Sequence, residues 1–180
     1  KREIQIKTCS FMKTIYIVRH AKSSWKFFNL SDQLRPLNKR GYQSASLIGN
    51  ALLKKNIQLD KIISSPATRA LSTAQILSTI LNYKIKNIEI SEDIYTFSDS
   101  GRIIFDTLKQ LHSSINSVAV FGHNSTLENI AHKLSNGEIF HFPTCAVLAL
   151  QYDSSNWDNL SMDTVKIDYL LTPKDLEYKI

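Results

Sequence analysis

The chain has 180 residues, of which 43% are hydrophobic, and this length and composition predict a single domain over residues 1–180 with a sizeable core. The net charge of +6 admits an anionic substrate, but the lysines are scattered and no nucleic-acid motif accompanies them, so we expect no nucleic-acid partner. No apolar run approaches the roughly 20 residues of a membrane helix, so we expect no membrane span.

The cysteines and the N-terminus indicate where the chain works. Cys9 and Cys145 lack the spacing of metal ligands, and a domain of this size needs no disulfide, so a reducing cytoplasm is expected. Residues 1–11 are basic without the apolar core of a signal peptide. Because Met12 directly precedes the first strand, residues 1–11 are interpreted as a loosely attached leader.

Apolar runs of strand length alternate with helical patterns along the chain. In order, we expect a strand at 14–18, a helix at 39–55, a strand at 61–65, a helix at 66–81, a strand at 86–90, a helix at 100–112, a strand at 117–122, a helix at 124–134, and strands at 146–152 and near 163–170. This alternation predicts a three-layer α/β/α sandwich with a mostly parallel sheet.

Two polar residues are expected to cap helices. Asn38 precedes the helix that begins near Lys39. Ser65 is expected to be the N-cap of the next helix, with Pro66 at its first position.

Unusual residues follow three of the strands. Arg19 and His20 follow the first strand, Arg69 lies in the first turn of the helix after the second, and His123 follows the strand at 117–122. Sites in such sheets gather beyond the carboxyl ends of the strands. Two arginines and two histidines on one edge, beside helix N-termini, would form a cationic pocket suited to a phosphoryl group.

Several segments resemble the histidine phosphatase, or phosphoglycerate mutase-like, superfamily, and most closely its phosphohistidine phosphatases of the SixA type. The three superfamily motifs are matched by VRHAKSS, SSPATRALSTA and VFGHNSTLENIA, with Ala21 where glycine is commonest. The SixA-type segments are matched by SDQLRPLNKRG and FPTCAVLALQYDSSNW. The resemblance spans roughly Met12 to Pro173.

The resemblance implies that His20 is the nucleophile and forms a phosphohistidine intermediate, which water then hydrolyses. Arg19 and Arg69 would clamp phosphate oxygens with their planar forks. His123, if protonated, would add a donor, and Asn124 at a helix start and Ser23 are candidate phosphate-binding residues. Because the cations are side chains, no metal or other cofactor is required.

The leaving group decides whether the reaction needs a proton donor. An alkoxide leaving group needs a general acid, whereas the ring of phosphohistidine can leave as neutral imidazole. Glu92, or its neighbour Asp93, is the candidate donor; the alternative is a solvated loop carboxylate. The segment that follows lacks the extended form of the metabolite-type members and looks more like the short loop of SixA-type proteins.

Three functions remain open at this point. The leading one is a metal-independent phosphatase acting on phosphohistidine in proteins. The alternatives are a phosphatase of small phosphomonoesters and a non-catalytic module that binds phosphorylated proteins.

The loop after the nucleophile and the remaining histidines have simpler interpretations. Trp25 and the pair Phe27-Phe28 either line the pocket mouth or pack the loop onto the body of the domain, and Asp32 and Arg35 are expected to pair and pin that loop. Three further histidines, His112, His132 and His141, lack metal spacing and are expected at the surface.

Overall fold

The computed structural model describes residues 12–97 and 100–177, so the expectation for residues 1–11 lies outside the described part. The elements are β1 (Met12–Arg19), η1 (Asp32–Leu34), α1 (Lys39–Lys54), β2 (Lys61–Ser64), α2 (Thr68–Ile80), η2 (Ile85–Asn87), β3 (Glu89–Ile90), η3 (Glu92–Ile94), α3 (Arg102–Lys109), β4 (Ser117–Gly122), α4 (Thr126–Leu134), β5 (Val147–Asp153), η4 (Met162–Thr164), β6 (Val165–Leu171) and α5 (Pro173–Glu177).

The strands form one sheet in the order β3-β2-β4-β1-β5-β6. β1, β2, β3 and β4 are mutually parallel, β5 is antiparallel to β1, and β6 is antiparallel to β5. Only β5 therefore runs against the other strands of the sheet, which confirms the expected mostly parallel sheet. β5 is reversed because the segment after α4 returns to the carboxyl edge of β1, where the Phe142 carbonyl oxygen lies 2.6 Å from the Arg19 side chain.

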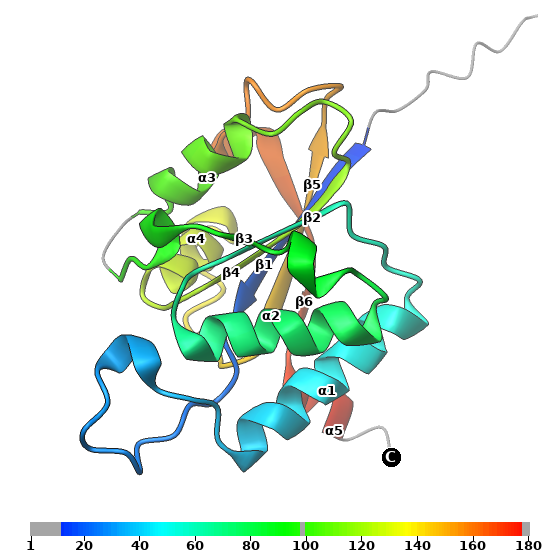
Figure 1. Cartoon of the computed structure of the whole chain (residues 1–180). Helices are drawn as coiled ribbons and strands as arrows, with labels where there is room; N and C mark the ends of the chain where they lie inside the picture. Colours follow the sequence, from blue (N-terminus) through cyan, green and yellow to red (C-terminus); the bar gives the residue numbers. More distant parts are fainter. Residues whose placement is uncertain (1–11, 98–99, 178–180) are drawn as a thin grey trace, which may run out of the picture.

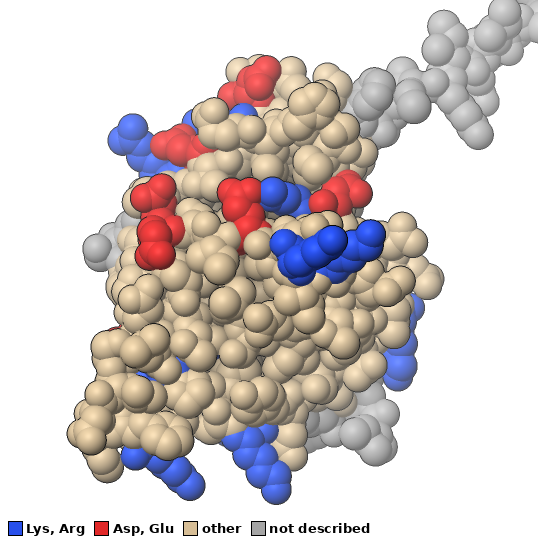
Figure 2. Space-filling view, in the orientation of Figure 1, with Lys and Arg blue, Asp and Glu red and all other residues tan. Residues whose placement is uncertain are grey.

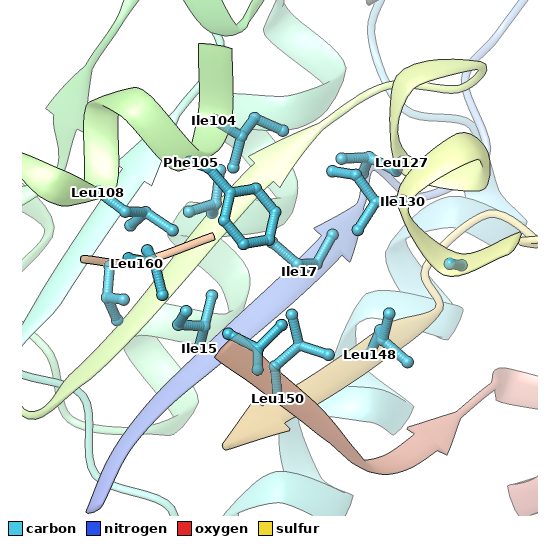
Figure 3. Packing of buried hydrophobic residues seen from close by; sticks show 14 of the residues in the cluster. Ile15, Ile17, Ile104, Phe105, Leu108, Leu127, Ile130, Leu148, Leu150 and Leu160 are labelled. Carbon is cyan, nitrogen blue, oxygen red and sulfur yellow. The ribbon is translucent and has the colours of Figure 1, made fainter. Parts of the chain in front are cut away.

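Helices cover both faces of the sheet (Figure 1). Side chains alternate across β1, so Tyr16 and Val18 belong to the cluster on the α1 and α2 face. Ile15 and Ile17 belong to the cluster on the opposite face. Figure 3 shows Ile15 and Ile17 among apolar side chains of α3, α4 and β5, namely Ile104, Phe105, Leu108, Leu127, Ile130, Leu148 and Leu150. Burying each such side chain contributes about 1.5–3 kcal/mol, so β1 is anchored from both sides just before the site.

Some expected boundaries were wrong. α2 begins at Thr68 with Ala67 at the N-cap position, so Ser65 does not cap this helix. The Ser65 hydroxyl is instead 2.7 Å from the His123 ring. Asn38 does cap α1, since its side chain accepts a hydrogen bond from the Gly41 amide at 2.9 Å.

Other elements are shorter than their patterns suggested. The strand expected at 86–90 is reduced to Glu89–Ile90, because this exposed edge of the sheet begins with the 3-10 turn η2. α3 covers Arg102–Lys109 instead of 100–112, and α4 begins at Thr126 rather than at residue 124. Within residues 12–97 and 100–177, no helix is both long and apolar enough to cross a membrane.

Candidate active site

The residues that follow β1, β2 and β4 meet at one edge, because β4 lies between β1 and β2 in the sheet. The His20 amide donates to the Gly122 carbonyl at 3.2 Å, and the Ser65 amide donates to the Phe121 carbonyl at 2.9 Å. The Arg69 Nε atom is 3.2 Å from His20 Nε2, and the ring centroids of His20 and His123 are 5.1 Å apart. The structure thus brings the four expected residues into one cluster.

His20 is held in one tautomer. Its Nδ1 atom lies 2.8 Å from the Ala21 carbonyl oxygen, so Nδ1 carries the hydrogen and donates it. Burial lowers the pKa of His20 to about 4, since the opposing effect of the Ala21 hydrogen bond is smaller and the nearby arginines lower it further. The ring is therefore neutral at pH 7, with a lone pair on Nε2 that accepts a hydrogen bond from Arg69.

The backbone after His20 is held by two contacts that the sequence did not predict. The Ala21 amide donates to the Thr73 hydroxyl oxygen at 3.0 Å, and that hydroxyl donates to the Arg69 carbonyl at 2.6 Å. Helix α1 also packs directly on this backbone, because a Cβ atom at Gly41 would overlap the carbonyl oxygen of Lys22. The turn carrying the imidazole is therefore clamped between α1 and α2.

Arg69 is buried and anchored by Asp32. Its Nη1 donates to the Asp32 carbonyl at 2.5 Å, and its Nη2 pairs with Asp32 Oδ2 at 2.7 Å. The expected pair of Asp32 and Arg35 is confirmed at 2.8 Å, and Tyr95 donates its hydroxyl to the same carboxylate at 2.8 Å. Burial raises the pKa of Asp32, but the hydrogen bonds from Tyr95, Arg69 and Arg35 outweigh it and hold the pKa at about 2.

Arg19 shares the Phe142 carbonyl with Asn124. Arg19 Nη1 donates to that oxygen at 2.6 Å, and the Asn124 side-chain amide donates to it at 3.0 Å. Asn124 thus lies beside the cluster with its amide engaged in this contact. The Arg19 Nε atom is buried and has no hydrogen-bond partner among the described residues.

His123 is buried beside Ser65, Tyr95 and Phe97. Burial, reinforced by the neighbouring His20 and arginines, lowers the pKa of His123 to about 3. The ring is therefore neutral at pH 7, whereas the family resemblance allowed for a protonated His123. The Ser65 hydroxyl oxygen accepts from the Ala67 amide at 3.3 Å and lies 2.7 Å from His123 Nε2. If the hydroxyl donates to Nε2, the Nδ1 atom carries the hydrogen, and no described residue accepts it.

The unsatisfied donors of this cluster indicate an anion site. A buried N–H group without an acceptor costs about 1–3 kcal/mol. Arg19 Nε is such an atom, and His123 Nδ1 is a second one when the Ser65 hydroxyl donates to His123 Nε2. The oxygens of a phosphoryl group bound next to His20 Nε2 would supply acceptors, with Arg69 Nε as a further donor.

The remaining candidates lie outside this cluster. The Ser23 hydroxyl accepts a hydrogen bond from Arg35 Nη2 at 2.7 Å, inside the loop after β1. Glu92 and Asp93 are exposed in η3, and neither carboxylate forms a hydrogen bond or ion pair with a described residue. Asp93 lines a separate cavity of about 550 Å³ near Lys61 and α3.

The other histidines lie at the surface, as expected: His112, His132 and His141. His141 lies 3.4 Å from the Glu128 carboxylate. The described part of the chain contains no group of three or more His, Cys, Asp or Glu residues positioned to hold a metal ion.

The chain is similar to several known proteins. Residues 15–94 match the sequence model of the "Histidine phosphatase superfamily (branch 1)". An uncharacterised chloroplastic protein of Arabidopsis thaliana is 26% identical over 155 residues, which cover 83% of this chain and 71% of that protein. The phosphohistidine phosphatase SixA of Escherichia coli is 24% identical over 149 residues, covering 79% of this chain and 91% of SixA.

A solved structure of the protein histidine phosphatase SixA, complexed with tungstate, superimposes with a TM-score of 0.75 at 22% identity, over 91% of this chain and 99% of that one. Together, the fold and these matches define a phosphatase with a phosphoglycerate mutase-like fold. The chain is thus similar to the histidine phosphatase superfamily both in the sequence of residues 15–94 and in its fold.

Proposed function

We propose that this protein hydrolyses phosphohistidine in a phosphorylated protein, through a covalent phospho-His20 intermediate. The observation that carries the proposal is the state of His20, whose ring is neutral and donates from Nδ1 to Ala21, leaving the Nε2 lone pair beside Arg69. The similarity to SixA supports the same substrate class.

In the first step, His20 Nε2 attacks the phosphorus atom as the bond from phosphorus to the substrate imidazole breaks. The departing ring leaves as neutral imidazole when its other nitrogen carries a proton, so no strong acid is needed. Arg19, Arg69 and His123 donate hydrogen bonds to the oxygens, whose charge they stabilise in the transition state.

In the second step, water attacks the phosphorus atom of phospho-His20. Because Nδ1 keeps its hydrogen throughout, His20 departs as the same neutral imidazole that began the reaction, and inorganic phosphate is released. Catalysis thus depends on position and charge in a buried pocket.

The carboxylates near the site favour phosphohistidine over an alkyl phosphate. An alkoxide leaving group needs a proton donor. Asp32 is the carboxyl group in contact with the cluster, and with a pKa of about 2 it holds no proton at pH 7. Glu92 and Asp93 are exposed, and neither carboxylate forms a hydrogen bond or ion pair with the four clustered residues.

The test compares one preparation on a phosphohistidine peptide, a phosphoserine peptide and a sugar phosphate. We expect a kcat/KM for phosphohistidine at least about 10²-fold above the other two, and a loss of roughly 10³-fold or more in His20→Ala. Preferred hydrolysis of the sugar phosphate would indicate a phosphomonoesterase instead. Micromolar binding of the phosphopeptide without turnover would indicate a non-catalytic binding module.

A further inference from the structure

The loop after β1 exposes large apolar side chains beside the candidate active site. Trp25 is 72% exposed and Phe28 is 94% exposed. We call this set the loop surface; it consists of Trp25, Phe27, Phe28, Leu30 and Leu34. Of the two interpretations left open by the sequence, these exposures do not support burial of the three aromatic rings against the body of the domain.

The backbone beneath the loop surface is held by several hydrogen bonds. Arg35 donates to the Ser24 carbonyl at 3.2 Å, the Ser24 amide donates to the Pro36 carbonyl at 2.8 Å, and the Arg35 guanidinium lies 3.2 Å from the centroid of the Trp25 ring. Asp32 of the same loop pairs with Arg69. The backbone that carries the exposed side chains is therefore held in place, and it is bonded through Asp32 to Arg69.

The charged residues of the loop and of the start of α1 are mostly basic. Asp32 is the only acidic residue between His20 and Leu59, and it is already paired with Arg35 and Arg69. The exposed cations Lys22, Lys26, Lys39 and Arg40 form no ion pair with a described residue. On the face that Figure 2 shows, the lower part of the molecule, where Figure 1 places this loop, carries basic side chains and no visible acidic one.

We propose that the loop surface docks the phosphorylated partner protein, which presents an apolar side chain and acidic residues close to its phosphohistidine. The proposal rests on the proposed function, because the surface borders the pocket that receives the phosphoryl group. Aromatic side chains bury about 150–250 Å² each, so this set approaches the several hundred Å² of one side of a protein interface. A small phosphoester would leave most of it exposed.

A protein fits this position better than a lipid membrane does. Asp32 lies between Leu30 and Leu34 of the loop surface and binds Arg69, so an occupant of the surface is close to the clustered residues. A partner that carries the phosphoryl group must cover the entrance to the phosphate pocket in order to react, whereas a membrane there would block it. Basic side chains around the entrance would also accelerate the approach of an acidic partner.

The experiment uses two synthetic peptides of equal length, each with one histidine phosphorylated by phosphoramidate. One has acidic and apolar residues beside the histidine, and the other has serine and glutamine there. The readout is the kcat/KM for each peptide divided by that for free phosphohistidine. Binding of the unphosphorylated peptides is measured separately by fluorescence anisotropy.

We expect Phe28→Ser to lower this ratio about tenfold for the acidic and apolar peptide, with Phe28→Tyr restoring most of it. Ile85→Ser, which changes an exposed apolar residue in η2, is the matched control and should leave the ratio unchanged. The same peptide should bind more tightly than the polar one, and more weakly to Phe28→Ser than to the unmodified protein.

An unchanged ratio and unchanged peptide binding in Phe28→Ser would overturn the proposal. The proposal would also be overturned if Phe28→Ser abolished sedimentation with phosphatidylserine vesicles but left the peptide measurements unchanged. The loop surface would then bind membrane. Failure of the unmodified protein to hydrolyse any phosphohistidine would contradict the proposed function alone, because the anisotropy measurement still decides whether the surface binds such a peptide.

Discussion

His20 has different surroundings at its two ring nitrogens, and its protonation state follows from them. Nδ1 is committed to the Ala21 carbonyl, and Nε2 faces the cationic Arg69 side chain. A proton added at Nε2 would have to displace the Arg69 hydrogen bond and would meet like charge in a buried place. A nucleophilic imidazole requires this same neutral state, so the environment of His20 favours the form that the proposed mechanism needs.

The pH at which His20 titrates tests this arrangement. Because burial lowers the pKa from 6.5 to about 4, the ring should stay neutral, with its hydrogen on Nδ1, down to about pH 5. We expect ¹⁵N NMR shifts of His20 to be constant from pH 8 to about pH 5 and to change only near pH 4. The exposed His112 provides the internal comparison. A His20 midpoint near 6.5 would show that the site does not hold the ring neutral.

Among the elements, the turn η1 and its loop connect the surface to the site. Asp32 begins η1 and binds Arg69 of α2, Arg35 of its own loop and Tyr95 beyond η3. The sequence predicted the local pair of Asp32 and Arg35, which are three residues apart. It could not predict the bond to Arg69, which is 37 residues away, or to Tyr95, which is 63 residues away, because nothing in the local pattern marks these partners.

The stability of this loop should depend on acid pH. The folded pKa of Asp32, about 2, is below its ordinary value of 3.8, so its contribution is complete above about pH 4 and is lost as pH falls toward 2. We expect Asp32→Asn to lower the unfolding temperature at pH 6 and to make it less sensitive to pH between 4 and 2.

Asp158→Asn, which changes an exposed carboxylate, serves as the control and should retain the acid dependence of the unmodified protein. If Asp32→Asn has the same unfolding temperature as the unmodified protein at pH 6, Asp32 does not anchor the loop.

The contact between α1 and the turn after His20 gives a second prediction for an element. A Cβ at Gly41 would meet the fixed backbone of Lys22, whereas a Cβ at Gly49 would lie 2.6 Å from the end of the flexible Ile80 side chain. We expect Gly41→Ala to destabilise the fold by about 1–3 kcal/mol and to lower kcat by displacing His20.

Gly49→Ala is the matched control. It should cost less, because Ile80 can move and alanine favours a helix interior over glycine by about 1 kcal/mol. Chemical denaturation and turnover measured on both variants check the pair, and equal losses would contradict the assigned contact.

For the whole molecule, the sequence predicted what depends on short-range pattern and on the general geometry of parallel sheets. Arg19, His20, Arg69 and His123 were expected to converge because each follows a strand or begins the next helix, and they do converge. The α/β layers followed from alternating periodicity. The sheet also contains the reversed strand β5, which periodicity alone does not reveal.

What the sequence could not predict depends on contacts between distant segments. The local sequence around Ser65 predicted a helix cap. Its actual partner, His123, is 58 residues away and leaves no mark on that local pattern. The Thr73 hydroxyl accepts a hydrogen bond from the Ala21 amide, 52 residues away. In the sequence, Thr73 looks like any other polar residue of a helix. Such residues are identified only once the fold brings their partners together.

The most direct test of the central claim is to locate the covalent intermediate. The protein would be mixed with a phosphohistidine peptide, quenched within milliseconds in alkali, which preserves phosphohistidine, and mapped by mass spectrometry. The account predicts a phosphoryl group on His20 at a level approaching one per molecule early in the reaction, and none in His20→Ala. A phosphoryl group on another residue, or turnover in His20→Ala at the rate of the unmodified protein, would contradict it.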